Sequence, residues 1–379
     1  MTSRLAIGLI AFSAAVANAA TVPSDDANIV YSPYNWYHSG SAYAQTPNPG
    51  AYLKCGFTGT SLSVNLDVSP FTTANIPAAQ YPVIRYSVDG GPPTTLQLTP
   101  LTASIECAKG LKSGDHTFLL QYVAGYVFLD FWTPIDVIRV TGFALDDGAH
   151  TVAPTGRIAS KSRHVLFFGD SITNGDDDIA TFTGGISNAV DTQDATLGYP
   201  NIVAAATDAE FGIIAYGGAS WDSRAADGHT PGLNTFWSMF DKDHSRMVKD
   251  SRFPKPGERF DPIPDDIYIN MGENRTPKYE EVVQWLIALR RATSMNTNIF
   301  VIVPFSGRAR KELDMAVKLS VEGTGPAVRN YLIDLGDNPY LPDNGPTMFS
   351  VDGQHPLAAL HAQLGAQIVA ARAKLLAGK

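Results

Sequence analysis

The sequence predicts a mixed α/β protein in which an all-β sandwich precedes a parallel α/β domain. Apolar and polar residues alternate over much of 28–150, whereas continuous apolar strands alternate with helical stretches after residue 163. Alternation with period two is typical of strands that bury one face, and continuous apolar strands are typical of parallel sheets buried on both faces. The length of 379 residues is consistent with two domains.

The alternating pattern is clearest in the first third of the chain. Apolar side chains occupy every second position from Leu62 to Val68 and from Ile84 to Val88, and the second run leads into Asp89-Gly90-Gly91. An Asp-Gly pair after an alternating run predicts a hairpin turn. Many short strands with Gly, Pro and Asp turns predict a β-sandwich or jelly roll.

The pattern changes after the polar segment 146–163, which we interpret as a linker or domain edge. Continuous apolar strands are expected at 164–168, 210–215, 266–270, 298–303 and 329–335. Helices are expected at 279–294, 308–319 and 356–376. Strands that alternate with helices predict a parallel sheet with helices on both sides. The predicted domains are therefore 21–150 and 151–379.

Residues 1–20 predict a secretory signal peptide. A positive charge near the start precedes an apolar stretch, Leu5–Val16, that is too short to span a bilayer comfortably. Ala17-Asn18-Ala19 fits the small-residue cleavage pattern, with cleavage after Ala19 or Ala20. An N-terminal membrane anchor is the alternative. We expect a secreted, extracellular protein with no membrane partner.

The charge balance argues against nucleic-acid partners. The chain has 28 Lys and Arg against 37 Asp and Glu, a net charge of −9. A surface of that sign repels phosphate backbones. A hydrophobic content of 44% is enough for a core and excludes a disordered chain.

The chain has two cysteines, Cys55 and Cys107, both in the predicted first domain. In an oxidising compartment such a pair commonly forms a disulfide. Two buried free thiols are the alternative, because sequence spacing does not give the separation of the Cα atoms. Two cysteines and scattered histidines do not form a zinc pattern, and we expect no metal.

Two polar groups of residues suggest nucleophilic catalysis. Ser171 follows Gly169-Asp170 at the end of the first parallel strand, where open α/β sheets bind ligands. A helix that begins there would favour the charge formed on attack, although a serine in this place can also be a helix N-cap. Asp352 and His355 lie three residues apart before another helix. They can supply the base that a serine needs and the acid that orients it. A capping arrangement with a solvated histidine is the alternative.

Two further strand ends carry donors for an oxyanion. Asn274 follows Gly272 after a strand, and its side-chain amide can donate to a developing negative charge. The Gly217-Gly218 pair follows another strand and allows a backbone N–H to face a ligand closely.

In this order, these four blocks resemble those of the SGNH hydrolases, also called the GDSL esterase/lipase superfamily. The resemblance covers about 164–379 and implies a flavodoxin-like three-layer α/β/α domain. It also implies that Ser171 is the nucleophile, His355 the general base and acid, and Asp352 the orienting acid. The family chemistry needs no cofactor and no metal.

The same resemblance implies the composition of the oxyanion hole. The Ser171 N–H, the Gly218 N–H and the Asn274 side chain would form it, with the N–H of Gly217 or Ser220 as an alternative to Gly218. The chain departs from the family pattern twice. Ile172 replaces the usual leucine, and Arg275 replaces the usual aspartate after the asparagine. The second departure leaves the local support of the asparagine side chain open.

The order of domains resembles carbohydrate esterase family 2, in which a jelly roll precedes the SGNH domain. The segments Gly50–Phe57, Tyr86–Gly90 and Ala215–Gly218 are consistent with this resemblance. It implies a serine esterase that removes acetyl groups from plant polysaccharide such as xylan or glucomannan, with an acetylated polysaccharide or oligosaccharide as partner. A GDSL-type lipase or general carboxylesterase is one alternative. A non-catalytic carbohydrate-binding protein is another.

Other residues have both a functional and a structural interpretation. Trp221 can stack on a sugar or pack in the core. The aromatic residues between Tyr31 and Tyr43 can form a sugar-binding strip or pack between strands. The run Asp176–Asp178 can bind a cation, although a solvated loop is the expectation. His361 is expected to be structural. Asn274-Arg275-Thr276 is a glycosylation sequon, and we expect an unmodified Asn274 in a cleft.

Overall fold

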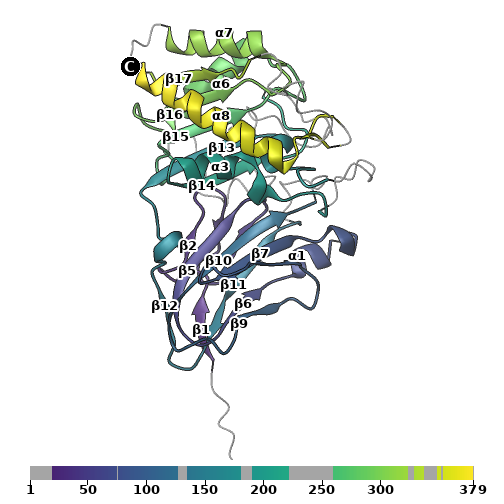
Figure 1. The fold of residues 1–379 in the computed structure, drawn as a ribbon, viewed down its shortest axis with the longest axis vertical. Coiled ribbons are helices and arrows are strands. Elements are labelled where there is room, and N and C mark those ends of the chain that lie inside the picture. Colours follow the sequence, from purple (N-terminus) through teal and green to yellow (C-terminus); the bar gives the residue numbers. More distant parts are fainter. Residues whose placement is uncertain are drawn as a thin grey trace, which may run out of the picture.

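The architecture is taken from a computed structural model of the chain (Figure 1). It describes residues 19–74, 76–126, 135–180, 190–221, 259–322, 328–336, 348–350 and 353–378. Strands between Ala20 and Val152 form antiparallel sheets, and we call this part the antiparallel region. From Arg163 onward the strands form one parallel sheet with its helices, which we call the parallel-sheet region.

The antiparallel region contains two sheets. The first has the order β3 (Tyr37–His38), β4 (Ala44–Thr46), β11 (Ile138–Leu145), β6 (Leu62–Leu66) and β9 (Ser104–Ala108), with β1 (Ala20–Pro23) paired to β11. The second has the order β12 (Thr151–Val152), β5 (Tyr52–Gly59), β10 (Gly114–Ala124), β7 (Val83–Val88) and β8 (Thr94–Gln97), with β2 (Val30–Tyr31) paired to β5. Short helices α1 (Ser69–Thr72), η1 (Ala78–Gln80) and η2 (Gly156–Ile158) lie between or after these strands.

The core of the antiparallel region lies between its two sheets. In β6 the side chains of Leu62, Val64 and Leu66 are buried and alternate with partly exposed ones, as predicted. The rings of Phe118 on β10 and Phe143 on β11 meet edge to face 6.0 Å apart and connect the sheets.

The predicted hairpin turn joins β7 to β8. Asp89 and Gly90 both have positive φ, at 53° and 64°, and Gly91 N donates to Val88 O at 2.9 Å. Positive φ at both central residues gives a turn whose twist matches that of the strands, which explains the Asp-Gly sequence.

The two cysteines are free thiols, so the predicted disulfide is absent. Cys55 lies on β5 and Cys107 on β9, which belong to different sheets. Both thiols pack against the core between the sheets, and burial raises the pKa of each to about 12. The alternative of two packed thiols therefore describes the structure.

The parallel sheet has the strand order β14 (Ala209–Ala215), β13 (Arg163–Gly169), β15 (Asp266–Asn270), β16 (Asn298–Ile302) and β17 (Asn330–Ile333). Every residue of β15 and β16 is buried, as expected for strands covered on both faces. All five strands lie where the sequence predicts them.

Helices cover both faces of the parallel sheet. One face carries α3 (Tyr199–Ala206) and α8 (Ala358–Ala377), and the other carries α6 (Tyr279–Arg291) and α7 (Arg310–Val321). Figure 1 shows α3 and α8 on the near side of the sheet. The helices α6, α7 and α8 agree with the predicted ones, whereas α3 was not predicted. Pro200 and three consecutive alanines hide the periodicity of this short helix.

Part of the predicted signal peptide, 1–18, lies outside the described residues. Strand β1 begins at Ala20, which pairs with Leu145 of β11. Cleavage after Ala19 would keep this strand whole, whereas cleavage after Ala20 would remove its first residue. No helix in the described part of the chain is long and apolar enough to cross a membrane.

Ionic contacts connect the two regions, and one of them is buried. Lys54 of β5 donates to Glu210 of β14 at 2.5 Å, and both side chains are 6% exposed. The hydroxyl of Tyr52 donates to the other oxygen of Glu210. Further along the interface, Arg85 forms a bidentate pair with Asp194 at 2.6 and 3.2 Å.

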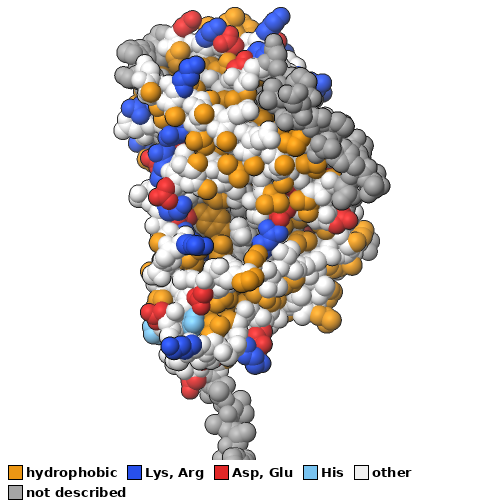
Figure 2. Space-filling model, viewed as in Figure 1, with side chains coloured by type: hydrophobic (Ala, Val, Ile, Leu, Met, Phe, Trp, Pro, Cys, Tyr) orange, Lys and Arg blue, Asp and Glu red, His pale blue; other side chains and the backbone are white. Residues whose placement is uncertain are grey.

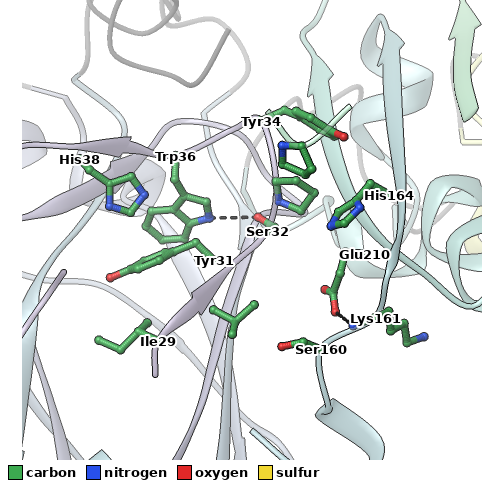
Figure 3. A pocket seen from close by; sticks show the side chains of 13 residues that line it. Ile29, Tyr31, Ser32, Tyr34, Trp36, His38, Ser160, Lys161, His164 and Glu210 are labelled. Atoms are coloured by element: carbon green, nitrogen blue, oxygen red, sulfur yellow. Dashed lines mark hydrogen bonds between the residues drawn. The ribbon is translucent and has the colours of Figure 1, made fainter. Parts of the chain in front are cut away.

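A pocket of about 270 Å³ lies beside the Glu210 contact. Figure 3 shows Tyr31 and Trp36 on one wall and His164 and Glu210, from the parallel sheet, on the other. Trp36 is buried, and Tyr31 meets its ring edge to face at 4.9 Å. Packing between strands therefore explains these aromatic side chains better than a sugar-binding strip.

The surface carries both signs of charge. Figure 2 shows Lys and Arg side chains interspersed with Asp and Glu over the described surface on this face. This arrangement differs from the basic stripe that a nucleic-acid-binding surface needs.

Replacing Lys54 with methionine should destabilise the protein strongly. Glu210 would then be a buried carboxylate without its cation, which typically costs about 3 kcal/mol or more. Urea unfolding of the Lys54→Met variant measures this loss. The matched control is Lys109→Met, because Lys109 and Glu106 form an exposed pair, for which we expect less than about 1 kcal/mol. Equal midpoints for the two variants would contradict the burial of the Lys54–Glu210 pair.

Candidate active site

Ser171 lies at the carboxyl end of β13, at a sharp turn from strand to helix. A Cβ atom at Gly169 would lie 1.9 Å from Oγ1 of Thr173, so only glycine allows the turn to pack this closely. Asp170 is the N-cap, and its Oδ1 accepts from Ile172 N at 3.1 Å. Ser171 is thus the first helical residue and not the cap, and its side chain is 6% exposed.

The helix after Ser171 is much shorter than expected. It is a single turn, α2 (Ser171–Asn174), which ends at Gly175 with φ of 76°. A macrodipole sums over aligned peptides, so one turn supplies little of the expected helix field. The predicted stabilisation of an oxyanion would therefore depend on individual donors near the serine.

The acidic run Asp176–Asp178 follows this turn directly, and Asp176 N donates to Ser171 O at 3.0 Å. The expectation of a solvated loop is wrong. Each of the three side chains is at most 2% exposed. Oδ1 of Asp176 accepts from Asn174 Nδ2 and from Gln193 Nε2, both at 2.8 Å. Oδ1 of Asp178 accepts from Asp194 N at 2.6 Å. Burial raises the pKa of Asp176 to about 7 and that of Asp178 well above its usual range.

No group of three or more His, Cys, Asp or Glu side chains within the described ranges is arranged to hold a metal ion. Within the acidic run, Oδ1 of Asp176 and Oδ1 of Asp178 are hydrogen-bonded to neighbours, whereas Oδ2 of each is buried without a hydrogen-bond partner among the described residues.

His355 lies next to the acidic run. A bridge between Phe349 and Pro356 and a hydrogen bond from Ser350 N to His355 O at 2.9 Å shape its loop. Ala358 N, at the start of α8, donates to Asp178 O at 2.8 Å. These contacts hold the loop of the histidine against the acidic run that follows Ser171.

The imidazole of His355 faces a carboxylate that the sequence analysis did not assign. Its Nδ1 lies 4.0 Å from Oδ2 of Asp177. The charge of His355 also lowers the pKa of Asp170 and Asp176, against the larger effect of their burial. Asp352, the predicted orienting acid, lies outside the described residues.

Asn274 connects three strand ends. Its Nδ2 donates to Ala219 O at 3.0 Å and to Oδ2 of Asp170 at 3.4 Å. Asp170 and Ala219 therefore hold this amide in place. They provide the local support that the arginine at position 275 left open in the sequence. Burial raises the pKa of Asp170 to about 7.

The turn after β14 carries the predicted backbone donor. Gly218 has φ of 73°, in the left-handed region that glycine adopts readily. Ala219 N donates to Tyr216 O at 3.2 Å and closes the turn. Together, these contacts place Gly218, Asn274, Asp170 and Ser171 at one edge of the parallel sheet.

Trp221 is part of the core, which is a correction to its predicted contact with substrate. Its side chain is 1% exposed, and its Nε1 donates to Met271 O at 2.9 Å. Its ring meets Trp285 of α6 edge to face at 5.5 Å. The alternative of core packing is the one that the structure supports.

His361 is buried within α8 and is structural, as expected. Its Nδ1 accepts from Tyr199 N at 3.3 Å, and its ring stacks on Tyr199. Burial lowers its pKa to about 3, so this imidazole is neutral at physiological pH.

Sequence reasoning missed the segment that supports the acidic run. Gln193 donates to Asp176 and to Asn174 O, and its Oε1 accepts from Gly125 N at 2.9 Å, at the end of β10. A pocket of about 510 Å³ lies along this segment, between it and the β7–β8 hairpin, and includes Ile179. No spacing or periodicity in 190–194 marks these contacts.

The comparisons with known proteins agree with the fold. No protein family model matches the sequence, and no curated protein matches it either. A family two carbohydrate esterase from Cellvibrio japonicus has 16% identity and a TM-score of 0.71, covering 95% of this chain and 98% of its own.

Two other solved structures are similar. An acetyl xylan esterase from the rumen bacterium Butyrivibrio proteoclasticus has 14% identity and a TM-score of 0.69, with 93% of this chain and 97% of the other covered. A family two carbohydrate esterase from Clostridium thermocellum in complex with cellohexaose has 18% identity and a TM-score of 0.66, covering 90% and 97%. The resemblance to the SGNH hydrolases and carbohydrate esterase family 2 is thus confirmed in the fold.

The free energy of unfolding should depend on pH through Asp176. The carboxyl has a pKa of about 7 when folded and about 3.9 when unfolded, so the folded state holds the proton more tightly. Its contribution to stability therefore falls as pH rises from about 4 to about 7. Asparagine cannot titrate, so Asp176→Asn should gain stability relative to the wild type between about pH 5 and about pH 8.

Urea unfolding of both proteins at the two pH values measures this difference. Asp208→Asn is the control, because a hydrogen bond from Lys161 holds the pKa of the exposed Asp208 below its usual range. We expect no relative gain for this control. A difference between Asp176→Asn and wild type that does not change with pH would contradict the raised pKa.

Proposed function

We propose that the protein is a secreted serine esterase that removes O-acetyl groups from plant cell-wall polysaccharide such as xylan or glucomannan. The observation that supports the proposal is that Asp170 and Asn274 connect the strand ends that carry Ser171 and Gly218, while the imidazole of His355 lies beside the acidic run that follows the serine. In this proposal, residues 21–150 form a jelly roll, and residues 151–379 form a flavodoxin-like three-layer SGNH domain.

The reaction begins when Oγ of Ser171 attacks the ester carbonyl carbon. His355 accepts the hydroxyl proton as the Oγ–C bond forms, and the N–H groups of Ser171 and Gly218 stabilise the oxyanion. The tetrahedral intermediate then expels the sugar oxygen, to which His355 returns the proton. Water, deprotonated by His355, attacks the acyl-enzyme, and acetate leaves as the serine regains its proton.

Asn274 contributes a donor to the same oxyanion. Its bond to Ala219 O is the shorter of its two contacts, and its bond to Asp170 is long at 3.4 Å. The hydrogen directed at Asp170 is the one that can turn to an oxyanion, while the bond to Ala219 keeps the amide in place.

The choice of substrate rests on the similar structures and on the surface. Family two carbohydrate esterases and an acetyl xylan esterase share the fold. The pocket beside 190–194 lies along the antiparallel region and includes Ile179, the residue that follows the acidic run, so it offers a concave surface for part of a polymer chain. The net charge of −9 suits a neutral polymer better than an anionic one. Secretion follows from the signal peptide predicted at residues 1–20.

Replacing Ser171 with alanine should lower kcat for 4-nitrophenyl acetate by at least about a thousandfold, because the nucleophile is lost. Ser160→Ala is the matched control, since Ser160 lines the pocket beside Glu210 instead of this site. Full activity of Ser171→Ala would overturn the mechanism.

The substrate class is tested by acetate release from acetylated xylan and acetylated glucomannan, measured alongside 4-nitrophenyl esters of increasing acyl length. We expect release from at least one polysaccharide and a preference for acetyl over longer chains. A preference for long acyl chains would support a GDSL-type lipase or general carboxylesterase instead. Binding to the polysaccharides without acetate release would support a non-catalytic carbohydrate-binding protein.

A further inference from the structure

The carboxylate of Asp177 has a fixed position between two partners. Its Oδ1 accepts from Thr192 Oγ1 at 2.7 Å, and its Oδ2 lies 4.0 Å from Nδ1 of His355. The side chain is 2% exposed. The hydrogen bond from Thr192 restrains this buried carboxylate, and its Oδ2 lies on the side of the imidazole.

The backbone around Asp177 fixes this orientation further. Its φ of 57° lies in the left-handed region, which aspartate tolerates better than most side chains. Ala180 N donates to Asp177 O at 3.1 Å, and Ile179 N donates to Thr192 O at 3.1 Å. Thr192 is therefore hydrogen-bonded both to the side chain of Asp177 and to the backbone of Ile179.

The other titratable groups near His355 have different partners. Asp170 accepts from Ile172 N and Asn274, and Asp176 accepts from Asn174 and Gln193. His361 on α8 is neutral. Among the described acids, Asp177 is the one within ion-pair distance of the His355 ring.

We propose that Asp177 is a positioning residue for His355, supplied by the same turn that carries the nucleophile. The inference rests on the proposed function. Because Nδ1 faces Asp177, Nε2 is the nitrogen that accepts the Ser171 proton as the Oγ–C bond forms. The imidazolium then carries a positive charge with Nδ1–H directed at the carboxylate.

The attraction is strongest when His355 carries the proton that it takes from Ser171 during the reaction. A contact of 4.0 Å is longer than a charge-assisted hydrogen bond of about 2.8 Å, so the resting interaction is electrostatic. An interaction that strengthens towards the transition state raises kcat and leaves KM nearly unchanged. A nearby negative charge also raises the pKa of the imidazole.

The test compares Asp177→Asn with wild type in 4-nitrophenyl acetate hydrolysis across pH. Asparagine removes the charge and keeps an acceptor for Thr192. We expect kcat to fall about tenfold, KM to change less than about twofold, and the acid limb of kcat/KM to move to lower pH by about half a unit or more. Asp178→Asn is the matched control, because it changes the neighbouring buried carboxylate and should leave the acid limb in place.

A second variant, Asp177→Gly, removes the carboxylate and suits the left-handed backbone, so it replaces Asp177→Asn if that variant does not fold. Loss of activity with an unmoved acid limb and a lower thermal midpoint would mean a structural role and overturn the proposal. Unchanged kcat and an unchanged acid limb would overturn it as well. Both results leave the serine esterase intact, because that function fails only if Ser171→Ala stays active.

Discussion

The site depends on the buried carboxyl of Asp170, which connects strand ends that the sheet alone only brings near one another. One oxygen caps the turn that carries Ser171, and the other receives the amide of Asn274, which in turn holds the carbonyl of Ala219. The ends of β13, β14 and β15 are thereby connected through two side chains. Because the carboxyl is buried, each of its hydrogen bonds forms without competition from water.

Much of the fold could be predicted because it depends on local patterns. The strands of the parallel sheet are continuous apolar runs, and β6 alternates because only one of its faces meets the core. Asp89-Gly90 predicts its hairpin because both residues must have positive φ. The places of Ser171 and Asn274 at one edge of the sheet could be predicted because each follows a continuous apolar strand, and parallel strands end at the same edge.

The remaining parts depend on contacts between distant segments. Asp176–Asp178 resembles a solvated acidic loop in sequence, and only the hydrogen bonds from 192–194 explain its burial. The short helix α2 ends at Gly175, which has a left-handed backbone conformation. The sequence did not predict that the helix ends there. Trp221 is a core residue because Met271 and Trp285, far away in sequence, surround it. Burial of this kind is a property of the whole fold and leaves no periodic signal.

Gln193 gives the antiparallel region a part in the organisation of the site. Its side chain accepts from the backbone of Gly125 at 2.9 Å and donates to Asp176 at 2.8 Å, so two hydrogen bonds separate β10 from the turn after the serine. The antiparallel region therefore cannot be exchanged without a change in the contacts that support the site. A chimera that takes its antiparallel region from one protein of this fold and its parallel-sheet region from another would need to recreate this junction.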